Sequence, residues 1–201
     1  RRNARRTALS IVGIAVGCAL ALFMESLNRG RDELFTRMAT YGGAGHVRVV
    51  PAGWRERRDP RLRLSDTQAD AGAIRQIPGV KATAVRARAQ ALVAMGTHVV
   101  PVEVVGVDPP AESAVNRIAR SVSEGRYLNA SDSGAAVIGQ AVADRLTAGL
   151  DDDILVTAVG ANGDIQSEML RIVGIVRTGS DDLDATFCHV PLRSEEHTSE
   201  L

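Results

Sequence analysis

The sequence of 201 residues is poor in aromatic side chains and carries no net charge. Aromatic residues make up 3% of the chain, so the flat rings on which sugars stack are scarce. The 24 Lys and Arg residues balance the 24 Asp and Glu residues, whereas a nucleic-acid-binding protein typically carries a basic excess. We therefore expect no nucleic-acid partner, and a carbohydrate-processing role is disfavoured.

Several catalytic and nucleotide-binding motifs are also absent from the sequence. Without a GxxxxGK[ST] motif the chain lacks the loop that cradles ATP phosphates, so we expect no ATPase activity of its own. There is no GxSxG nucleophile elbow, and the four histidines, His46, His98, His189 and His197, form no HExxH pair. We interpret each histidine as an ordinary surface or strand residue. The sequence thus argues against an enzyme, and we assign no catalytic residue and no cofactor.

Two cysteines and two acidic clusters are the remaining candidates for redox or metal chemistry. Cys18 lies in an apolar run near one end of the chain and Cys188 near the other, with no CxxC motif, so we expect no internal disulfide. The acidic clusters at residues 151–153 and 181–184 lack the spacing, the glycine and the closing Glu of a calcium loop. We interpret both as acidic turns and expect no metal site, while spacing alone leaves open a pair of carboxylates for glycoside hydrolysis.

The N-terminus carries a long hydrophobic run. Residues 7–24 contain no charged side chain, and as a helix they would be about 27 Å long, close to the bilayer's hydrocarbon thickness of about 30 Å. Four arginines precede the run within residues 1–6, which argues against a buried soluble helix. A cleaved signal peptide would have a shorter apolar core, of about 7–15 residues. We predict a transmembrane helix at residues 7–27 with a cytoplasmic basic head at residues 1–6.

A helical pattern continues beyond the predicted membrane segment. Leu27, Leu34, Phe35 and Met38 recur at spacings compatible with one apolar stripe, and a glycine-rich stretch then ends the helix. We interpret residues 28–44 as a stalk and linker. In one interpretation the stripe packs against the chain's own domain, and in the other it meets another subunit or an apolar substrate.

Residues 45–192 have the mixed pattern of an α+β domain. Alternating or β-branched runs predict strands at residues 46–50, 80–95, 99–107, 135–139, 154–159, 168–176 and 185–190. Gly96-Thr97 and the turn around Asn162-Gly163 predict two hairpins. Residues 54–63, rich in Arg, Asp and Pro, predict an exposed loop.

Short helices are predicted between these strands. A capping-box pattern at residues 65–68 predicts one, the prolines after Asp108 predict a second, and residues 140–147 predict a third. Their expected inner faces are Ala69, Ala73, Ile74 and Ile77 in the first, Val115, Ile118 and Ala119 in the second, and Val142, Ala143 and Leu146 in the third.

The last nine residues, 193–201, are polar and follow the final predicted strand directly. Their sequence, RSEEHTSEL, corresponds to the translation of a common sequencing adapter. We therefore expect them to be an artefact, with the natural protein continuing beyond Leu192.

Several segments resemble, in the same order, bacterial ABC transporter permeases of the lipoprotein-releasing, macrolide-exporter and FtsX-like superfamily. These segments are RRNARRTALSIVGIAVG (1–17), VGVDP (105–109), EGRYL (124–128), VIG (137–139), ADRL (143–146), RIVGIVRTG (171–179) with Asp184, and VPL (190–192). One departure is LDDD at residues 150–153, where the permeases usually show a Gly-Asp pair. That departure concerns a turn more than the assignment.

The resemblance implies a non-catalytic permease subunit of a bacterial inner (plasma) membrane, with the chain's helix as the first of four. Residues 45–192 would be the periplasmic core domain, so the expected architecture is a transmembrane helix with a stalk followed by a mixed α/β extracytoplasmic domain. The implied partners are a cytoplasmic ABC ATPase, a second permease copy or paralogue, membrane lipid, and a lipoprotein, peptide or drug as substrate. ATP-driven motion would pass through the stalk, where Leu27, Leu34, Phe35 and Met38 are the candidate contacts.

Two alternatives stay open. One is a single-span membrane protein whose outer domain binds a ligand or acts as a sensor. The other is a membrane-tethered hydrolase, which the missing motifs disfavour.

Overall fold

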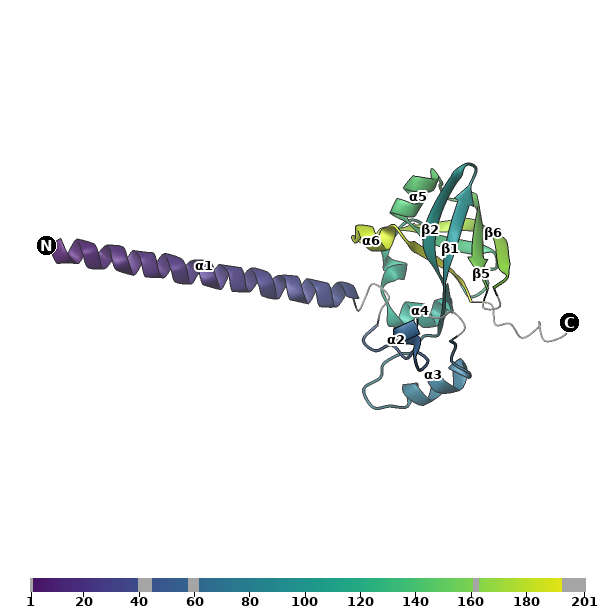
Figure 1. Cartoon of the computed structure of the whole chain (residues 1–201), viewed down its shortest axis with the longest axis horizontal. Coiled ribbons are helices and arrows are strands. Elements are labelled where there is room, and N and C mark those ends of the chain that lie inside the picture. Colours follow the sequence, from purple (N-terminus) through teal and green to yellow (C-terminus); the bar gives the residue numbers. More distant parts are fainter. Residues whose placement is uncertain (1, 40–44, 58–61, 161–162, 193–201) are drawn as a thin grey trace. The chain divides into compact units, whose positions relative to one another are not determined.

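The structure, a computed structural model, describes residues 2–39, 45–57, 62–160 and 163–192, and for residue 2 and residues 32–39 it describes the backbone only. The chain divides into two compact units, Arg1–Thr40 and Tyr41–Leu201. The first is a long helix and the second is a mixed α/β domain, as the sequence predicts (Figure 1). The predicted artefact at residues 193–201 lies outside the described residues.

The first unit consists of helix α1 (Arg2–Ala39), which runs for 38 residues (Figure 1). In the described part of the chain it is the one helix long and apolar enough to cross a membrane, with a candidate span of Asn3–Arg31 that contains an 18-residue window of mean hydropathy 2.3. Its large apolar side chains are exposed, among them Leu9 at 79% and Leu22 at 72%. The helix continues without a break from the predicted membrane segment into the predicted stalk.

The second unit is built on a seven-stranded sheet. Its strands are β1 (Arg86–Met95), β2 (His98–Val107), β3 (Val122–Gly125), β4 (Ala135–Gly139), β5 (Asp153–Val159), β6 (Ile165–Val176) and β7 (Phe187–Pro191). The strand order is β3-β6-β4-β7-β2-β1-β5, and β5 also pairs with β6. Six strands therefore form a closed ring, to which β3 is added beside β6.

The long strand β6 allows the ring to close. Its residues 165–171 pair antiparallel with β5, and its residues 171–176 pair parallel with β4. The pair β2–β7 is also parallel, whereas β1–β2, β1–β5 and β4–β7 are antiparallel. The sheet is thus mixed.

Two apolar cores lie on opposite faces of this sheet. Side chains alternate along a strand, so Ala136 and Ile138 of β4 belong to one core and Ala135 and Val137 to the other. The larger core draws residues from all six ring strands and from helix α5 (Gln140–Leu146). The α5 residues are the expected ones, Val142, Ala143 and Leu146, and all three are buried.

The smaller core lies under helix α4 (Pro109–Val115) and the 3₁₀ helix η2 (Ile118–Ser121). It contains the buried Ile118, Leu128 and Phe187 together with Val105 and Val107 of β2. Proline stands at the start of α4 as predicted, but the helix ends at Val115. The predicted single helix is therefore two short pieces.

The two hairpins are confirmed by the strand pairing. Met95 pairs with His98 across Gly96-Thr97, and Gly96 has a φ of 56°, which glycine adopts freely at the first central position of a two-residue turn. Val159 pairs with Ile165 around the second turn. Residues 161–162 of that turn lie outside the described residues.

Two predictions for the segment before the sheet are wrong. Residues 46–50 form no strand, and Val47 is 84% exposed, because no strand edge pairs with this alternating segment. The predicted loop at residues 54–63 begins instead with the short helix α2 (Trp54–Arg57). Residues 58–61 of the predicted loop lie outside the described residues.

Helix α3 (Thr67–Arg75) and strand β1 also begin later than predicted. The N-cap is Asp66, not Ser65, and its Oδ1 accepts from the Ala69 N–H at 2.9 Å. The predicted inner face of α3 is not buried, with Ile77 at 55% exposure, because this helix adds no residue to either core. Residues 80–85 stay outside the sheet because Arg86 pairs with Val107, the last residue of β2.

Candidate functional site

The stalk residues predicted to contact a partner are only partly described. Leu27 lies on α1 and is 52% exposed. The backbone of Leu34, Phe35 and Met38 is helical, and their side chains lie outside the described part of the structure. The stalk contact therefore stays a prediction.

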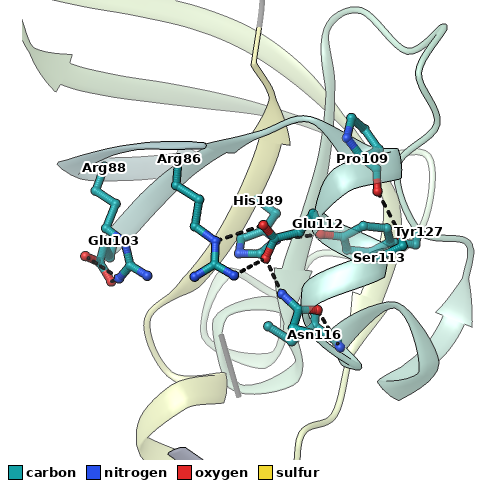
Figure 2. Close-up of polar contacts among 10 residues, drawn as sticks. Arg86, Arg88, Glu103, Pro109, Glu112, Ser113, Asn116, Tyr127 and His189 are labelled. Carbon is teal, nitrogen blue, oxygen red and sulfur yellow. Dashed lines mark hydrogen bonds and ion pairs between the residues drawn. The ribbon is translucent and has the colours of Figure 1, made fainter. Parts of the chain in front are cut away.

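The second unit contains a buried ion pair between the start of β1 and helix α4. Arg86 Nε donates to Glu112 Oε2 at 2.8 Å, and Arg86 Nη2 lies 2.8 Å from Glu112 Oε1 (Figure 2). The Glu112 side chain is fully buried, and that of Arg86 is 14% exposed. Both carboxylate oxygens are satisfied by the guanidinium fork, which allows this charge to remain away from water.

Asn116 extends this contact to the next element. It lies one helical turn after Glu112, so its Nδ2 can donate to Glu112 Oε1. Its Oδ1 accepts from the Ile118 N–H at 2.9 Å, where η2 begins. Through these bonds Glu112 and Asn116 fix η2 relative to α4 and β1, and so position one wall of the site.

A hydrogen bond between Tyr127 and His189 lies beside the ion pair (Figure 2). Tyr127 Oη and His189 Nδ1 are 2.8 Å apart. Burial raises the pKa of Tyr127, and the negative charge of Glu112 raises it further. Burial lowers the pKa of His189 to about 3, assisted by the positive charges of Arg86 and Arg88. Both side chains are therefore neutral at ordinary pH.

Arg88 and Glu103 form a second, more open ion pair on the same face of the sheet. Arg88 Nη1 donates to Glu103 Oε1 at 3.3 Å and to Oε2 at 3.2 Å. The two side chains are 25% and 38% exposed. Both charges come from neighbouring strands, β1 and β2, and mark the edge of a small hollow.

This hollow has a volume of about 40 Å³. It is lined by Arg86, Arg88, Glu103, Val105, Ile118, Leu183, Thr186, Phe187 and His189. The rings of Phe187 and His189, which both line the hollow, are closely packed, with centroids 4.1 Å apart. Pockets for drug-sized ligands are roughly 300–1,000 Å³, so the space admits only a small chemical group.

Arg48, in the segment before α2, contributes to the charge near this hollow. Its guanidinium lies over the Trp54 ring, 4.7 Å from the centroid. Its pKa is lowered by partial burial and by the positive charges of Arg88 and Arg86, while Glu103 acts in the opposite direction. The segment at residues 46–50, predicted as a strand, therefore brings a cation near the site.

Of the segments that carry the family resemblance, residues 105–109 reach the hollow through Val105, whereas Gly139 and Gly174 have structural roles. A Cβ on Gly139 would overlap the backbone of Asp184, and one on Gly174 would overlap the carbonyl of Arg126. Arg126 itself binds Asp132 through Nη1 and Nη2 at 2.6 and 2.8 Å. Gly139 and Gly174 are therefore required because another backbone segment lies too close for a side chain. Arg126 stabilises the turn that contains Asp132.

The two acidic clusters are held by internal bonds, and residues 181–184, predicted as a turn, form the short helix α6 (Asp181–Asp184). Asp184 is buried, and its carboxylate accepts from the Thr178 N–H at 2.9 Å and from the Thr178 hydroxyl at 2.7 Å. Asp153 pairs with Arg171, and Asp152 accepts from the Gly149 N–H. In the described ranges no three His, Cys, Asp or Glu residues gather as metal ligands would.

The cysteines offer little chemistry in this fold. Cys188 is fully buried in the larger core, and burial raises its pKa to about 12, so it remains an unreactive thiol. Cys18 lies on α1 in the other unit.

Sequence reasoning missed the polar cluster formed by Arg86, Glu112, Asn116, Tyr127 and His189. One signal was available: Glu112 and Asn116 are spaced i, i+4, so they share a helical face with each other. The partners Arg86 and His189 could not be found this way, because the sheet brings them together from strands β1 and β7.

The comparisons with known proteins agree with this fold. A solved structure described as the extracellular domain of the noncanonic ABC-type transporter YknZ from Gram-positive bacteria is similar to this chain, with a TM-score of 0.50. The two are 18% identical, and the match covers 71% of this chain and 70% of that one, so the likeness concerns the fold. The family model of the MacB-like periplasmic core domain matches residues 7–200. Because this match spans nearly the whole sequence, the chain belongs to the family of MacB-like periplasmic core domains.

Proposed function

We propose that the chain is a permease subunit of an ABC transporter. Residues 7–27 cross the membrane, residues 28–44 form a stalk and linker, and residues 45–192 form an extracytoplasmic domain. The observation that carries the proposal is the family match over residues 7–200, which includes both the apolar helix and the domain. The similarity to the extracellular domain of the transporter YknZ supports the same assignment.

The continuity of α1 supports a mechanical role. At 1.5 Å per residue, its 38 residues are about 57 Å long, whereas the hydrocarbon core of a bilayer is about 30 Å thick. A helix placed across the membrane would therefore continue beyond it as a rod. In our proposal, ATP hydrolysis in a separate cytoplasmic subunit moves this helix, and the stalk transmits the motion to the outer domain. The cargo is a lipoprotein, a peptide or a drug.

Membrane topology is the first test. In a Cys18→Ser background, Ala4→Cys and Ser133→Cys are each treated with a membrane-impermeant maleimide on spheroplasts. We expect labelling at position 133 in intact spheroplasts and at position 4 only after lysis, because the basic head stays in the cytoplasm. The native Cys188 is buried and provides the unlabelled baseline. The reverse labelling pattern would reject the proposed orientation.

The permease role is tested separately by purification from native membranes in mild detergent. We expect a subunit that carries a Walker loop to copurify, together with magnesium-dependent ATPase activity. The alternative, a single-span sensor, predicts correct topology without such a subunit. The two results together distinguish an anchored domain from a transporter part.

A further inference from the structure

The N-terminal half of β6 has one side that no described strand covers. Residues 165–171 pair with β5 on one side (Figure 1). On the other side, β4 begins to pair with β6 only at Arg171, which faces Ala135. The remaining neighbour, β3, pairs with residues 174–176. Among the described strands, residues 165–170 therefore form an open edge in an otherwise closed ring.

The hydrogen bond at Arg171 shows which backbone groups point to this edge. The Arg171 N–H donates to the Gly134 C=O at 2.8 Å, on the side where β4 lies. Backbone groups point to alternate sides along a strand, so those of Ile165, Ser167 and Met169 point the same way as those of Arg171. These three residues present their N–H and C=O groups along the open edge.

The side chains leave this edge accessible and mostly uncharged. Residues 163–169 are all exposed, with Ile165 at 74% and Met169 at 60%. Sheet edges are usually protected by lysine, proline or a covering element. Residues 165–170 contain no lysine and no proline, and Glu168 is their one charged residue. A second extended strand can therefore pair here.

The sequence of the edge is self-complementary in one register. An antiparallel pairing of β6 with β6 of a second copy is symmetric, so it centres on one residue. Centred on Ser167, it places Ile165 opposite the partner's Met169 and Glu168 opposite the partner's Gln166. Apolar pairs stabilise such a pairing, and like charges directly opposite each other destabilise it.

The neighbouring registers bring like charges together. A pairing centred on Glu168 places the two Glu168 carboxylates opposite each other. One centred on Gln166 places Asp164 opposite the partner's Glu168. The register centred on Ser167 avoids both contacts, because no charged residue then faces another across the edge.

This register also continues the rows of side chains on the outer face of the sheet. Within the chain, Leu155 pairs with Met169 and Val159 pairs with Ile165. In the joined sheet, Leu155 and Met169 would be followed by the partner's Ile165 and Val159, which gives an unbroken apolar row. Between the two symmetric rows lies a row of hydroxyls, since Thr157 Oγ1 and Ser167 Oγ are 2.9 Å apart.

We propose that two copies of this chain associate edge to edge, with β6 antiparallel to the partner's β6 and Ser167 at the two-fold axis. Ile165, Ser167 and Met169 exchange backbone hydrogen bonds with the partner's Met169, Ser167 and Ile165. A contact along half a strand is smaller than the standard interface of about 800 Å² per partner, so we expect it to form between copies held in one membrane. It rests on the proposed anchoring by α1 and on no step of transport, and the maleimide labelling tests that anchoring separately.

Disulfide crosslinking of the full chain in bacterial membranes tests the pairing. In a Cys18→Ser background, Ser167→Cys should give a covalent dimer on oxidation, because facing Cα atoms in a hydrogen-bonded antiparallel pair are about 5.5 Å apart, within reach of a disulfide. Thr157→Cys is the matched control on the same face. It lies one strand further from the axis, so two copies would be about 14 Å apart, and we expect at least tenfold less dimer. The native Cys188 is buried.

Ile165→Cys and Met169→Cys test the register. Each variant alone places its thiol about 14 Å from the same position in the partner, four residues along the strand. Co-expressed with different tags, the two variants bring their thiols opposite each other, so we expect the covalent dimer only in that combination. Ser167→Lys in both chains should then lower the yield about threefold or more, because two like charges meet at the axis.

Three results would overturn the proposal. Equal dimer from Ser167→Cys and Thr157→Cys would indicate random collision. A Ser167→Cys chain that stays monomeric, or that crosslinks to a different protein, would show that the edge does not receive a second copy. Crosslinking of Ile165→Cys with Met169→Cys that is absent, or unchanged by Ser167→Lys, would reject the register centred on Ser167.

Discussion

Arg86 and Glu112 are 26 positions apart in the sequence and meet through two contacts of 2.8 Å. One contact comes from Nε and the other from Nη2, so the guanidinium covers both oxygens of a fully buried carboxylate. The pair connects the first residue of β1 to helix α4. The segment that leads from α1 through residues 45–85 enters the sheet at this residue.

We expect Arg86→Ala to lower the free energy of unfolding by about 3–5 kcal/mol, because Glu112 would keep a buried charge without its partner. The double variant Arg86→Met/Glu112→Leu should recover most of that loss. Arg171→Ala is the control, since its pair with Asp153 is about half exposed and should contribute little to stability. Urea unfolding gives all three values, and equal losses in Arg86→Ala and Arg171→Ala would contradict the burial argument.

Gly139→Ala should destabilise the domain by about 1–3 kcal/mol, because the new methyl group would collide with the backbone of Asp184. The φ of Gly139 is −74°, so the cost arises from space and not from backbone conformation. Gly72→Ala is the matched control on the exposed helix α3, where nothing lies within 4 Å of the added atom. That change should stabilise by about 0.5–1 kcal/mol. The pair is compared by thermal unfolding, and a neutral Gly139→Ala would show that β4 and α6 (Asp181–Asp184) are less closely packed than described.

His189 should make the domain lose stability in mild acid. Its folded pKa of about 3 lies below the unfolded value of about 6.5, so in this window the unfolded chain binds a proton that the folded chain does not. Stability therefore falls as pH decreases from about 6.5 towards 3, with a slope from this residue of up to about 1.4 kcal/mol per pH unit. Urea unfolding at several pH values should show a smaller slope for His189→Gln than for the parent chain. His98→Gln, at an exposed position, is the control, and an unchanged slope in His189→Gln would show that His189 is not held neutral.

Cysteine crosslinking tests the stalk stripe. In a Cys18→Ser background, single cysteines at Leu27, Leu34, Phe35 and Met38 should crosslink to a partner subunit or to a photoreactive lipid in the full complex. Arg29→Cys is the control, because its side chain is 81% exposed and pairs with Glu25. Crosslinks from the stripe only to the chain's own domain would support the alternative in which the stalk folds back on it.

Local sequence patterns predicted the local elements of the fold well. The β4 strand and α5 helix could be read from Ala135–Gly139 and the following apolar periodicity, and the hairpin at Gly96 from its turn residues. The family resemblance, drawn from motifs such as EGRYL and VIG, is confirmed by the match over residues 7–200. These features depend on interactions between residues that are close together in the sequence, which is why local sequence patterns could predict them.

The long-range features could not be predicted in the same way. The ring closure depends on β6 pairing with β5 along one half and with β4 along the other, and no single-sequence pattern encodes such a shared strand. For His46–Val50 the local pattern predicted a strand that does not form. Its alternation fits a strand, but the segment pairs with no strand of the sheet. The polar cluster was missed for the same reason, because β1 and β7 bring Arg86 and His189 together.

The position of β7 has a consequence for how the domain forms during export. Among the described strands it comes last in the sequence, yet it lies between β2 and β4 in the ring. Until Phe187–Pro191 has emerged, the earlier strands can assemble only an open sheet in which β2 and β4 each have an edge that β7 would otherwise pair. Such edges readily pair with other chains. The domain should therefore be most prone to aggregate immediately before β7 arrives, and a chaperone that shields strand edges would act at that stage of translocation.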